Sequence, residues 1–457
     1  MRGYTSNTHS IHASPLSRLR HMSKRILLSI QLALLLLAAS PDSRAQSGRP
    51  SQALRQVAQQ QRKLLEAIQR DAERSLSPAP GAFAPDPPDP DEMDEALIKF
   101  ATERAAGFKI GDWKGEELYA LATLYQEAEQ FALAGEAFRA YLKGDSKSNS
   151  RTEMAANARM GLIRALIETG QLDEAEKALE GAEWDITDNP AALTTRTELY
   201  KDLAAALRDR GLYDKVATLA DKGYKLANSL VLSSNLPPIL LEAAEINQII
   251  LAATAVASYE RVGRKTEADE LNKMALDFDF DRRPELRSVY ESELTVARLI
   301  GTPAPELEVS RWIEGRQGAP KSLSELRGNV VLLDFWAMWS QPSVIAFPRL
   351  RGFQSKYAGK GFELIGVTKF YGRSDGEESL SREQEFKSLQ NYKARRQLTY
   401  PFAVGKMDDV TNEERYGVAG VPTVILIDRR GVVRSVKRGV GEYRKLEKHI
   451  ERLINEK

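Results

Sequence analysis

The sequence has no cysteine among its 457 residues. This absence excludes thiolate catalysis, structural disulfides and metal sites built on cysteine. Histidine is nearly as scarce: His9, His12 and His21 lie near the N-terminus, and only His449 follows residue 45. A nucleophile activated by histidine and a histidine-ligated metal are therefore not expected. We expect neither a metal nor a cofactor.

The sequence also lacks a strong excess of either positive or negative charge. Lysine and arginine number 65, against 64 aspartates and glutamates. Residues 1–45 hold six basic residues and one acidic residue, so the remainder has 59 basic and 63 acidic residues. A mildly acidic chain of this kind gives no reason to expect a nucleic acid as the partner.

Residues 1–45 have the pattern of a leader with a secretory signal peptide. Lys24 and Arg25 precede an apolar stretch of 14 residues, which is shorter than the roughly 20 residues that a membrane-spanning helix needs. Small residues before Gln46 predict cleavage between Ala45 and Gln46. We therefore expect an exported protein of the periplasm or cell envelope, without a membrane span after cleavage. An uncleaved N-terminal anchor is the alternative.

Residues 46–93 are predicted to form a helical arm and a linker. Apolar residues at helical spacing over 48–75 favour a helix, either mobile or in a coiled coil. Six prolines between Ser77 and Pro90 are incompatible with helix or sheet and predict an extended linker.

Residues 94–299 carry apolar residues at helical spacing, and one pattern repeats. The position of Ala134 recurs at Ala175 and Val216, a period of 41, and again at Ala268. With glycine between the large and the small position in three copies, two antiparallel helices can pack closely across a tight turn. The positions expected to pack the helices together are Tyr125, Ala134, Phe138, Gly170, Ala175, Gly211, Val216, Gly263 and Ala268.

This repeat resembles tetratricopeptide repeats (TPR). It departs from that family in its period, which is usually about 34, and in lacking the proline that ends each unit. The resemblance implies an α-solenoid with a concave face open to peptides or proteins. An ordinary helical bundle is the alternative.

After residue 300 short apolar strands alternate with helices, which indicates an α/β fold. A charged helix at 382–396, inside an insertion at 371–397, is expected to lie solvated over one edge of the sheet. The expected strands are 329–335, 362–368, 401–404, 423–428 and 432–437, and the expected helices are 340–357 and 442–455.

Two motifs in this region resemble the thioredoxin fold. Residues 333–343 read LDFWAMWSQPS, like the active-site segment, and residues 417–423 read GVAGVPT, like the loop of the family's cis-proline. Segments 301–305 and 323–328 are typical of TlpA/ResA-like proteins and their AhpC/TSA (redoxin) relatives. The implied fold class is an α + α/β multidomain chain, with a TPR-like α-solenoid at 94–299 and a thioredoxin-fold α/β sandwich at 300–457.

The resemblance assigns a role to several residues. The family's two redox cysteines correspond to Ser340 and Ser343, its buried carboxylate to Asp334 and its cis-proline to Pro422. A helix N-terminus lowers a pKa by about one unit, which cannot make a serine alkoxide abundant, and serine forms no disulfide. We therefore expect no catalytic residue here. Ser340 is expected to cap the helix, and Asp334 to find a hydrogen-bond partner or stay protonated if buried.

Both motifs offer candidates for binding an extended peptide without a covalent step. Trp336 and Trp339 are also interpreted as aromatics of the scaffold. The candidates for peptide binding are Trp339, Gln341, Pro342, Val421, Pro422 and Thr423.

These features favour an exported interaction protein rather than an enzyme. The repeats would recruit a protein partner, and the redox-inactive thioredoxin-like part would be a binding module. Two alternatives stay open. One is a component of a thiol–disulfide oxidoreductase system that presents substrates to a cysteine-bearing partner. The other is a chaperone-like protein that binds extended chains.

Overall fold

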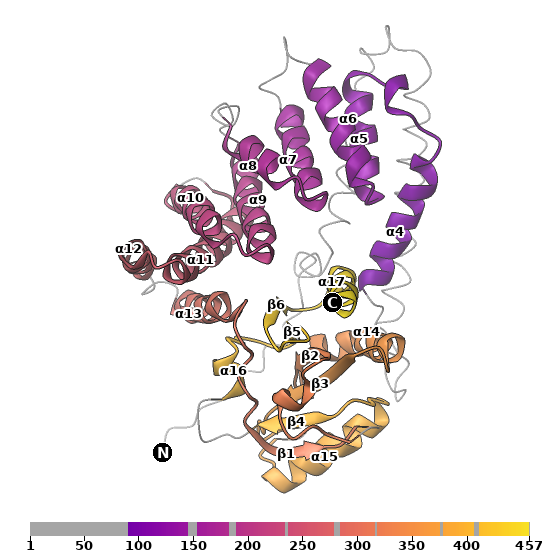
Figure 1. Ribbon diagram of the computed structural model, residues 1–457, viewed down its shortest axis with the longest axis vertical. Coiled ribbons are helices and arrows are strands. Elements are labelled where there is room, and N and C mark those ends of the chain that lie inside the picture. Colours follow the sequence, from indigo (N-terminus) through magenta and orange to yellow (C-terminus); the bar gives the residue numbers. More distant parts are fainter. Residues whose placement is uncertain are drawn as a thin grey trace, which may run out of the picture.

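The computed structural model describes residues 90–144, 153–181, 189–233, 236–277, 284–315, 318–374, 378–405 and 411–456 (Figure 1). The leader, the cleavage site and the helical arm lie outside these residues. The predicted linker overlaps them only at its end, where helix α4 begins at Pro90 rather than after residue 93. Proline suits this place because the first helical residue needs no N–H.

The first part of the described chain is helical. From α5 onward, consecutive helices are joined in pairs by short turns, and α5 contacts α6, α9 contacts α10 and α11 contacts α12. The helices are α4 (Pro90–Ala105), α5 (Gly115–Glu127), α6 (Phe131–Gly144), α7 (Glu153–Glu168), α8 (Leu172–Glu180), α9 (Pro190–Asp209), α10 (Tyr213–Val231), α11 (Pro238–Arg261), α12 (Lys265–Leu276) and α13 (Pro284–Leu299).

The turns inside the pairs share one backbone conformation. Gly170, Gly211 and Gly263 have φ angles of 77°, 74° and 80°, which favour glycine. Glu129 takes the same place between α5 and α6 with φ 56°. Just beyond each turn lies a buried position: Ala134, Ala175, Val216 and Ala268 are exposed by at most 1%. The assignment of these pairs to tetratricopeptide repeats stays a prediction.

Helix α11 is the central helix of this part. By length and composition it could cross a membrane, but most of its apolar stretch is buried inside the protein. It contacts α9, α10, α12 and α13. A helix that is apolar on all sides is expected in such a place, because neighbours cover every face.

The second part is a mixed six-stranded sheet in the order β1-β4-β3-β2-β5-β6. Strands β2, β3 and β4 are parallel, whereas β1, β5 and β6 pair antiparallel to their neighbours. The strands are β1 (Val309–Ile313), β2 (Val330–Phe335), β3 (Phe362–Thr368), β4 (Phe402–Gly405), β5 (Thr423–Ile427) and β6 (Val433–Arg438). The predicted fold class, a helical part followed by a thioredoxin-like α/β part, is confirmed.

Helices cover both faces of this sheet. Val330 and Leu332 of β2, and Trp336 directly after it, belong to the apolar core on the side of α14, α15 and α17. Leu333 and Phe335 face a second core, which includes Val296, Leu299 and Ile300 around the end of α13. The helices of this part are α14 (Gln341–Tyr357), α15 (Arg382–Arg395), α16 (Asn412–Arg415) and α17 (Tyr443–Asn455).

In Figure 1 the helical part arches over the sheet part, with α17 on the inner side of the arch. The Glu129 carboxylate lies 2.6 Å from the Arg444 guanidinium and 2.8 Å from the Lys448 ammonium of α17. Further along, Arg452 of α17 lies 3.4 Å from Asp209 at the end of α9. Helix α17 therefore covers part of the inner face that the sequence predicted to be open.

Candidate functional site

The site is built around the first turn of α14, directly after β2. Ser340 is the N-cap residue, and its Oγ accepts a 3.4 Å hydrogen bond from the Ser343 N–H, the capping role expected from the sequence. Gln341 and Pro342 follow in the first turn. Ser340 and Ser343 are both buried, with exposures of 5% and 1%.

The loop before β5 lies against this helix end. The Val421–Pro422 peptide bond is cis, as the resemblance implies, and the Ser340 hydroxyl donates to the Val421 carbonyl at 3.4 Å. The Pro422 carbonyl accepts from the Gly439 N–H at 2.8 Å. Within the described part of the chain the Val421 N–H has no hydrogen-bond partner. The two sequence motifs therefore meet at one place.

The Thr423 side chain lies in the interior rather than at the surface. It is fully buried, and its hydroxyl donates to the Gly420 carbonyl at 2.6 Å. Of the residues predicted to hold a peptide, Thr423 can therefore contribute only its backbone. Its side chain supports the turn that presents Val421.

Asp334 belongs to β2, the strand that leads into this helix end. It is 1% exposed, and neither carboxylate oxygen has a hydrogen-bond partner among the described residues. Burial raises its pKa from 3.8 to about 8, because the apolar surroundings penalise the charged form. The protonated, neutral form of Asp334 is therefore favoured well above the pH at which an aspartate usually ionises.

The two tryptophans of the first motif have different surroundings. Trp336 is fully buried and packs against Phe347 and Phe402. Trp339 is 40% exposed, and its ring lies 4.0 Å beneath the Arg373 guanidinium. Such a contact holds the indole ring in place while leaving part of it open to solvent.

Tyr371 and Arg373, which flank Trp339, were not predicted as site residues. The Tyr371 ring meets Trp339 edge-on with centroids 5.5 Å apart, and burial raises the pKa of its phenol. A signal was present: both residues follow β3, which runs parallel to β2. Because the carboxyl ends of parallel strands share one edge of a sheet, residues just after β3 lie near those just after β2.

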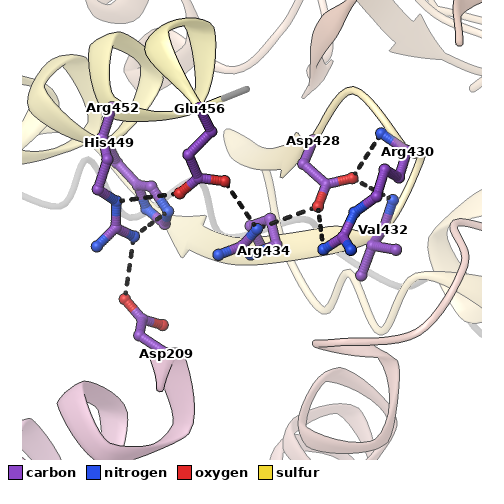
Figure 2. Close-up of polar contacts among 8 residues, drawn as sticks. All are labelled: Asp209, Asp428, Arg430, Val432, Arg434, His449, Arg452 and Glu456. Carbon is purple, nitrogen blue, oxygen red and sulfur yellow. Dashed lines mark hydrogen bonds and ion pairs between the residues drawn. The ribbon is translucent and has the colours of Figure 1, made fainter. Parts of the chain in front are cut away.

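His449 lies on α17, within the contact between the two parts of the chain. Its Nε2 is 2.8 Å from the Arg452 guanidinium (Figure 2), and burial together with Arg452 lowers its pKa. No hydrogen bond joins it to Ser340 in the described part of the chain. Among the same residues, no group of three or more acidic, histidine or cysteine side chains is arranged to hold a metal.

Comparison with known proteins concerns the second part of the chain. The model of the AhpC/TSA family matches residues 300–436. "Thiol-disulfide oxidoreductase ResA" of Geobacillus thermodenitrificans is 29% identical over 152 residues, which are 33% of this chain and 76% of that protein. ResA of Bacillus thuringiensis (strain Al Hakam) is 30% identical over 146 residues, 32% of this chain and 72% of that protein.

Other matches cover a similar share of the chain. "Protein DipZ" of Mycobacterium tuberculosis is 30% identical over 155 residues, which are 34% of this chain and 21% of that protein. A solved structure of a thiol:disulfide interchange protein DsbE from Chlorobium tepidum is 29% identical with a TM-score of 0.28, covering 34% of this chain and 98% of that one. These matches each span about a third of the chain.

Proposed function

Because the chain belongs to the AhpC/TSA family through its thioredoxin-like part, next to the ResA thiol-disulfide oxidoreductases, we propose that it keeps the family's site for noncovalent binding. In this proposal residues 300–457 bind an extended polypeptide without exchanging disulfides, and the helices at 94–299 recruit a protein partner. The whole chain then acts as an exported interaction scaffold.

The observation that carries the proposal is the pair of hydrogen bonds made by the hydroxyl of Ser340. Its hydroxyl accepts from the Ser343 N–H and donates to the Val421 carbonyl, so it fastens the helix end to the Pro422 loop. A serine hydroxyl remains protonated there, because the helix N-terminus shifts a pKa by only about one unit. The helix end and the Pro422 loop are thus joined at a place where no group can form or break a disulfide.

The exposed edge of the site supplies the binding groups. The Val421 N–H is unpaired among the described residues, and a peptide backbone placed alongside could accept from it, as in strand addition. Trp339, Gln341 and Pro342 lie at the neighbouring helix end, where the partly exposed indole offers apolar contact. Because these contacts involve the backbone of the peptide and one aromatic side chain of the site, they can accommodate peptides of many sequences.

Binding of carboxymethylated insulin B chain, an extended peptide with blocked thiols, tests the proposal. Isothermal titration calorimetry with the mature chain should detect binding, and Trp339→Ala should weaken it about tenfold. The matched control is Ile239→Ala, which removes an apolar side chain that is 74% exposed on α11 and should leave the affinity unchanged. Absence of binding, or equal losses in both variants, would contradict the proposal.

The names of the relatives favour a second candidate, a non-catalytic component of a thiol–disulfide oxidoreductase system. In that case the chain presents a substrate to a partner that bears cysteines. Mixed disulfides between that partner and its substrates, trapped in the native envelope with and without this chain, distinguish the two. A drop in trapped species when the chain is removed supports the second candidate, and an unchanged amount excludes it.

A further inference from the structure

A cavity of about 210 Å³ lies where the helical part meets the sheet part. It is formed between the turn that joins α9 to α10 and the turn that joins β5 to β6. The Pro422 loop is at the opposite end of β5, five residues away or about 16 Å at the usual rise of a strand. The cavity is therefore separate from the Ser340 site. Its charged and aromatic lining residues are Arg208, Asp209, Tyr213, Arg430 and Arg434.

The acids at this junction are already engaged with cations. Figure 2 shows Asp209 beside Arg452 and Asp428 beside Arg434, with separations of 3.4 Å and 3.1 Å. Glu456 also contacts Arg434, at 3.4 Å. These acids therefore have little capacity left to neutralise a further cation in the cavity wall.

Arg208, in the last turn of α9, is a further cation in the cavity wall. Its Nε is closed to solvent and has no hydrogen-bond partner, and its guanidinium forms no ion pair, among the residues that the structure describes. Burial also lowers its pKa, yet a guanidinium stays charged at any physiological pH. The acid that attracts it most, Asp209, is shared with Arg452 at 3.4 Å, and the more weakly acting Glu293 lies 2.5 Å from Arg438.

A desolvated cation without a partner is costly, whereas the same cation beside an anion is not. Arg430 adds a second guanidinium that is weakly held, since its closest acid, Asp428, is 3.6 Å away and the side chain is 80% exposed. Two guanidinium groups at the wall of one cavity match the oxygens of a phosphoryl group, which arginine binds through paired N–H donors.

We propose that this cavity binds a phosphate-type oxyanion, with Arg208 as its main ligand and Arg430 and Arg434 beside it. The anion would contact α9 from the helical part and the β5–β6 turn from the sheet part. Its binding would therefore stabilise the junction between the two parts. The anion is either free phosphate or the phosphoryl group of a larger molecule.

Thermal unfolding of the full chain tests the site, with inorganic phosphate, glycerol 3-phosphate and chloride compared at equal ionic strength. Phosphate or the ester should raise the Tm by several degrees in a saturable manner, because a ligand that binds only the native state stabilises it. A response to both probes identifies a site for free phosphate, and a response to the ester alone identifies a phosphoryl group on a larger molecule.

Arg208→Met separates binding from general salt effects. This variant should lose the response and, without anion, should melt at or above the wild-type Tm, because it removes a half-buried charge whose closed-off Nε has no partner among the described residues. Arg210→Gln is the control, since Arg210 is exposed, bonds to the Gly170 carbonyl and does not line the cavity; it should respond like the wild type. No saturable shift with either probe, or the same shift in Arg208→Met, would overturn the assignment.

Discussion

At the scale of single residues, the resemblance places two serines, Ser340 and Ser343, where the family has its redox cysteines, which is oxygen in place of sulfur at two positions. Ser340 uses its hydroxyl as a helix cap and as a link to the Val421 carbonyl. Asp334 is a buried carboxyl without a hydrogen-bond partner among the described residues, and burial raises its pKa to about 8. Its protonation has a measurable effect on stability.

Asp334→Asn should flatten the pH dependence of stability. The unfolded aspartate ionises near pH 3.8, whereas the native one does so only near pH 8. In the wild type the free energy of unfolding should therefore fall by up to about 1.4 kcal/mol per pH unit across this window, then level off above it. The variant has no carboxyl to ionise at this position and should not lose stability in this way. Its free energy of unfolding relative to that of the wild type should therefore rise from pH 4 to pH 8.

Urea unfolding at pH 4.5, 6, 7.5 and 9 measures the difference. The exposed Asp269→Asn is the control, and its curve should run parallel to that of the wild type. Parallel curves for Asp334→Asn as well would show that the buried carboxyl is ionised or hydrogen-bonded in the native protein.

The sequence was sufficient for the residues whose role depends on local structure. The cap at Ser340 follows from its position at the start of a helix. For Asp334 the sequence left two alternatives, a hydrogen-bond partner or protonation, and only the packing around it distinguishes them. Tyr371 and Arg373 were missed because their contact with Trp339 depends on how the chain turns after β3. The inward direction of the Thr423 side chain likewise depends on its partners across the sheet.

At the scale of elements, the sequence pattern located most strands and helices after residue 300. Strands β2 and β3 and helices α14 and α17 begin and end within one or two residues of the prediction. Strand β1 was missed because its sequence, VSRWI, has no regular alternation and only Ile313 is buried. The predicted domain boundary at residue 300 also separates segments that pack together. Helix α13 packs into the helical core through Tyr290 and against the sheet through Leu299.

Close packing between α6 and α7 predicts opposite effects for two glycines. A methyl group on Gly161 would lie 2.4 Å from the Phe138 ring, so Gly161→Ala should destabilise the protein by about 1–3 kcal/mol. On Gly135 it would lie 3.4 Å from the Ala165 methyl, an ordinary contact, so Gly135→Ala should stabilise by up to about 1 kcal/mol. Chemical unfolding measures both changes, and a stabilising effect of Gly161→Ala would mean that these helices pack less closely.

At the scale of the whole molecule, charged residues far apart in the sequence join the two parts. Glu129 and Arg444 are separated by 315 positions, so no local pattern predicts their contact. Glu129 also holds a left-handed conformation, which costs a non-glycine residue about 1–2 kcal/mol. The ion pairs with α17 offset part of this cost and place α17 on the inner face of the arch.

Reversing this charge should loosen the junction. Glu129→Arg would face two cations of α17, and small-angle X-ray scattering should show a larger radius of gyration. The triple variant Glu129→Arg, Arg444→Glu, Lys448→Glu should restore the compact form. Glu174→Arg, which disrupts an exposed ion pair with Arg139 inside the helical part, is the control. An unchanged radius for Glu129→Arg would show that other contacts suffice.

The most direct test of the whole account is an insulin-reduction assay of the wild type beside the double variant Ser340→Cys, Ser343→Cys. If only the two sulfur atoms are missing from an otherwise intact site, the wild type stays at the rate of the buffer and the double variant reduces insulin measurably faster. Turnover by the wild type, or a double variant that remains inert although folded, would contradict the account.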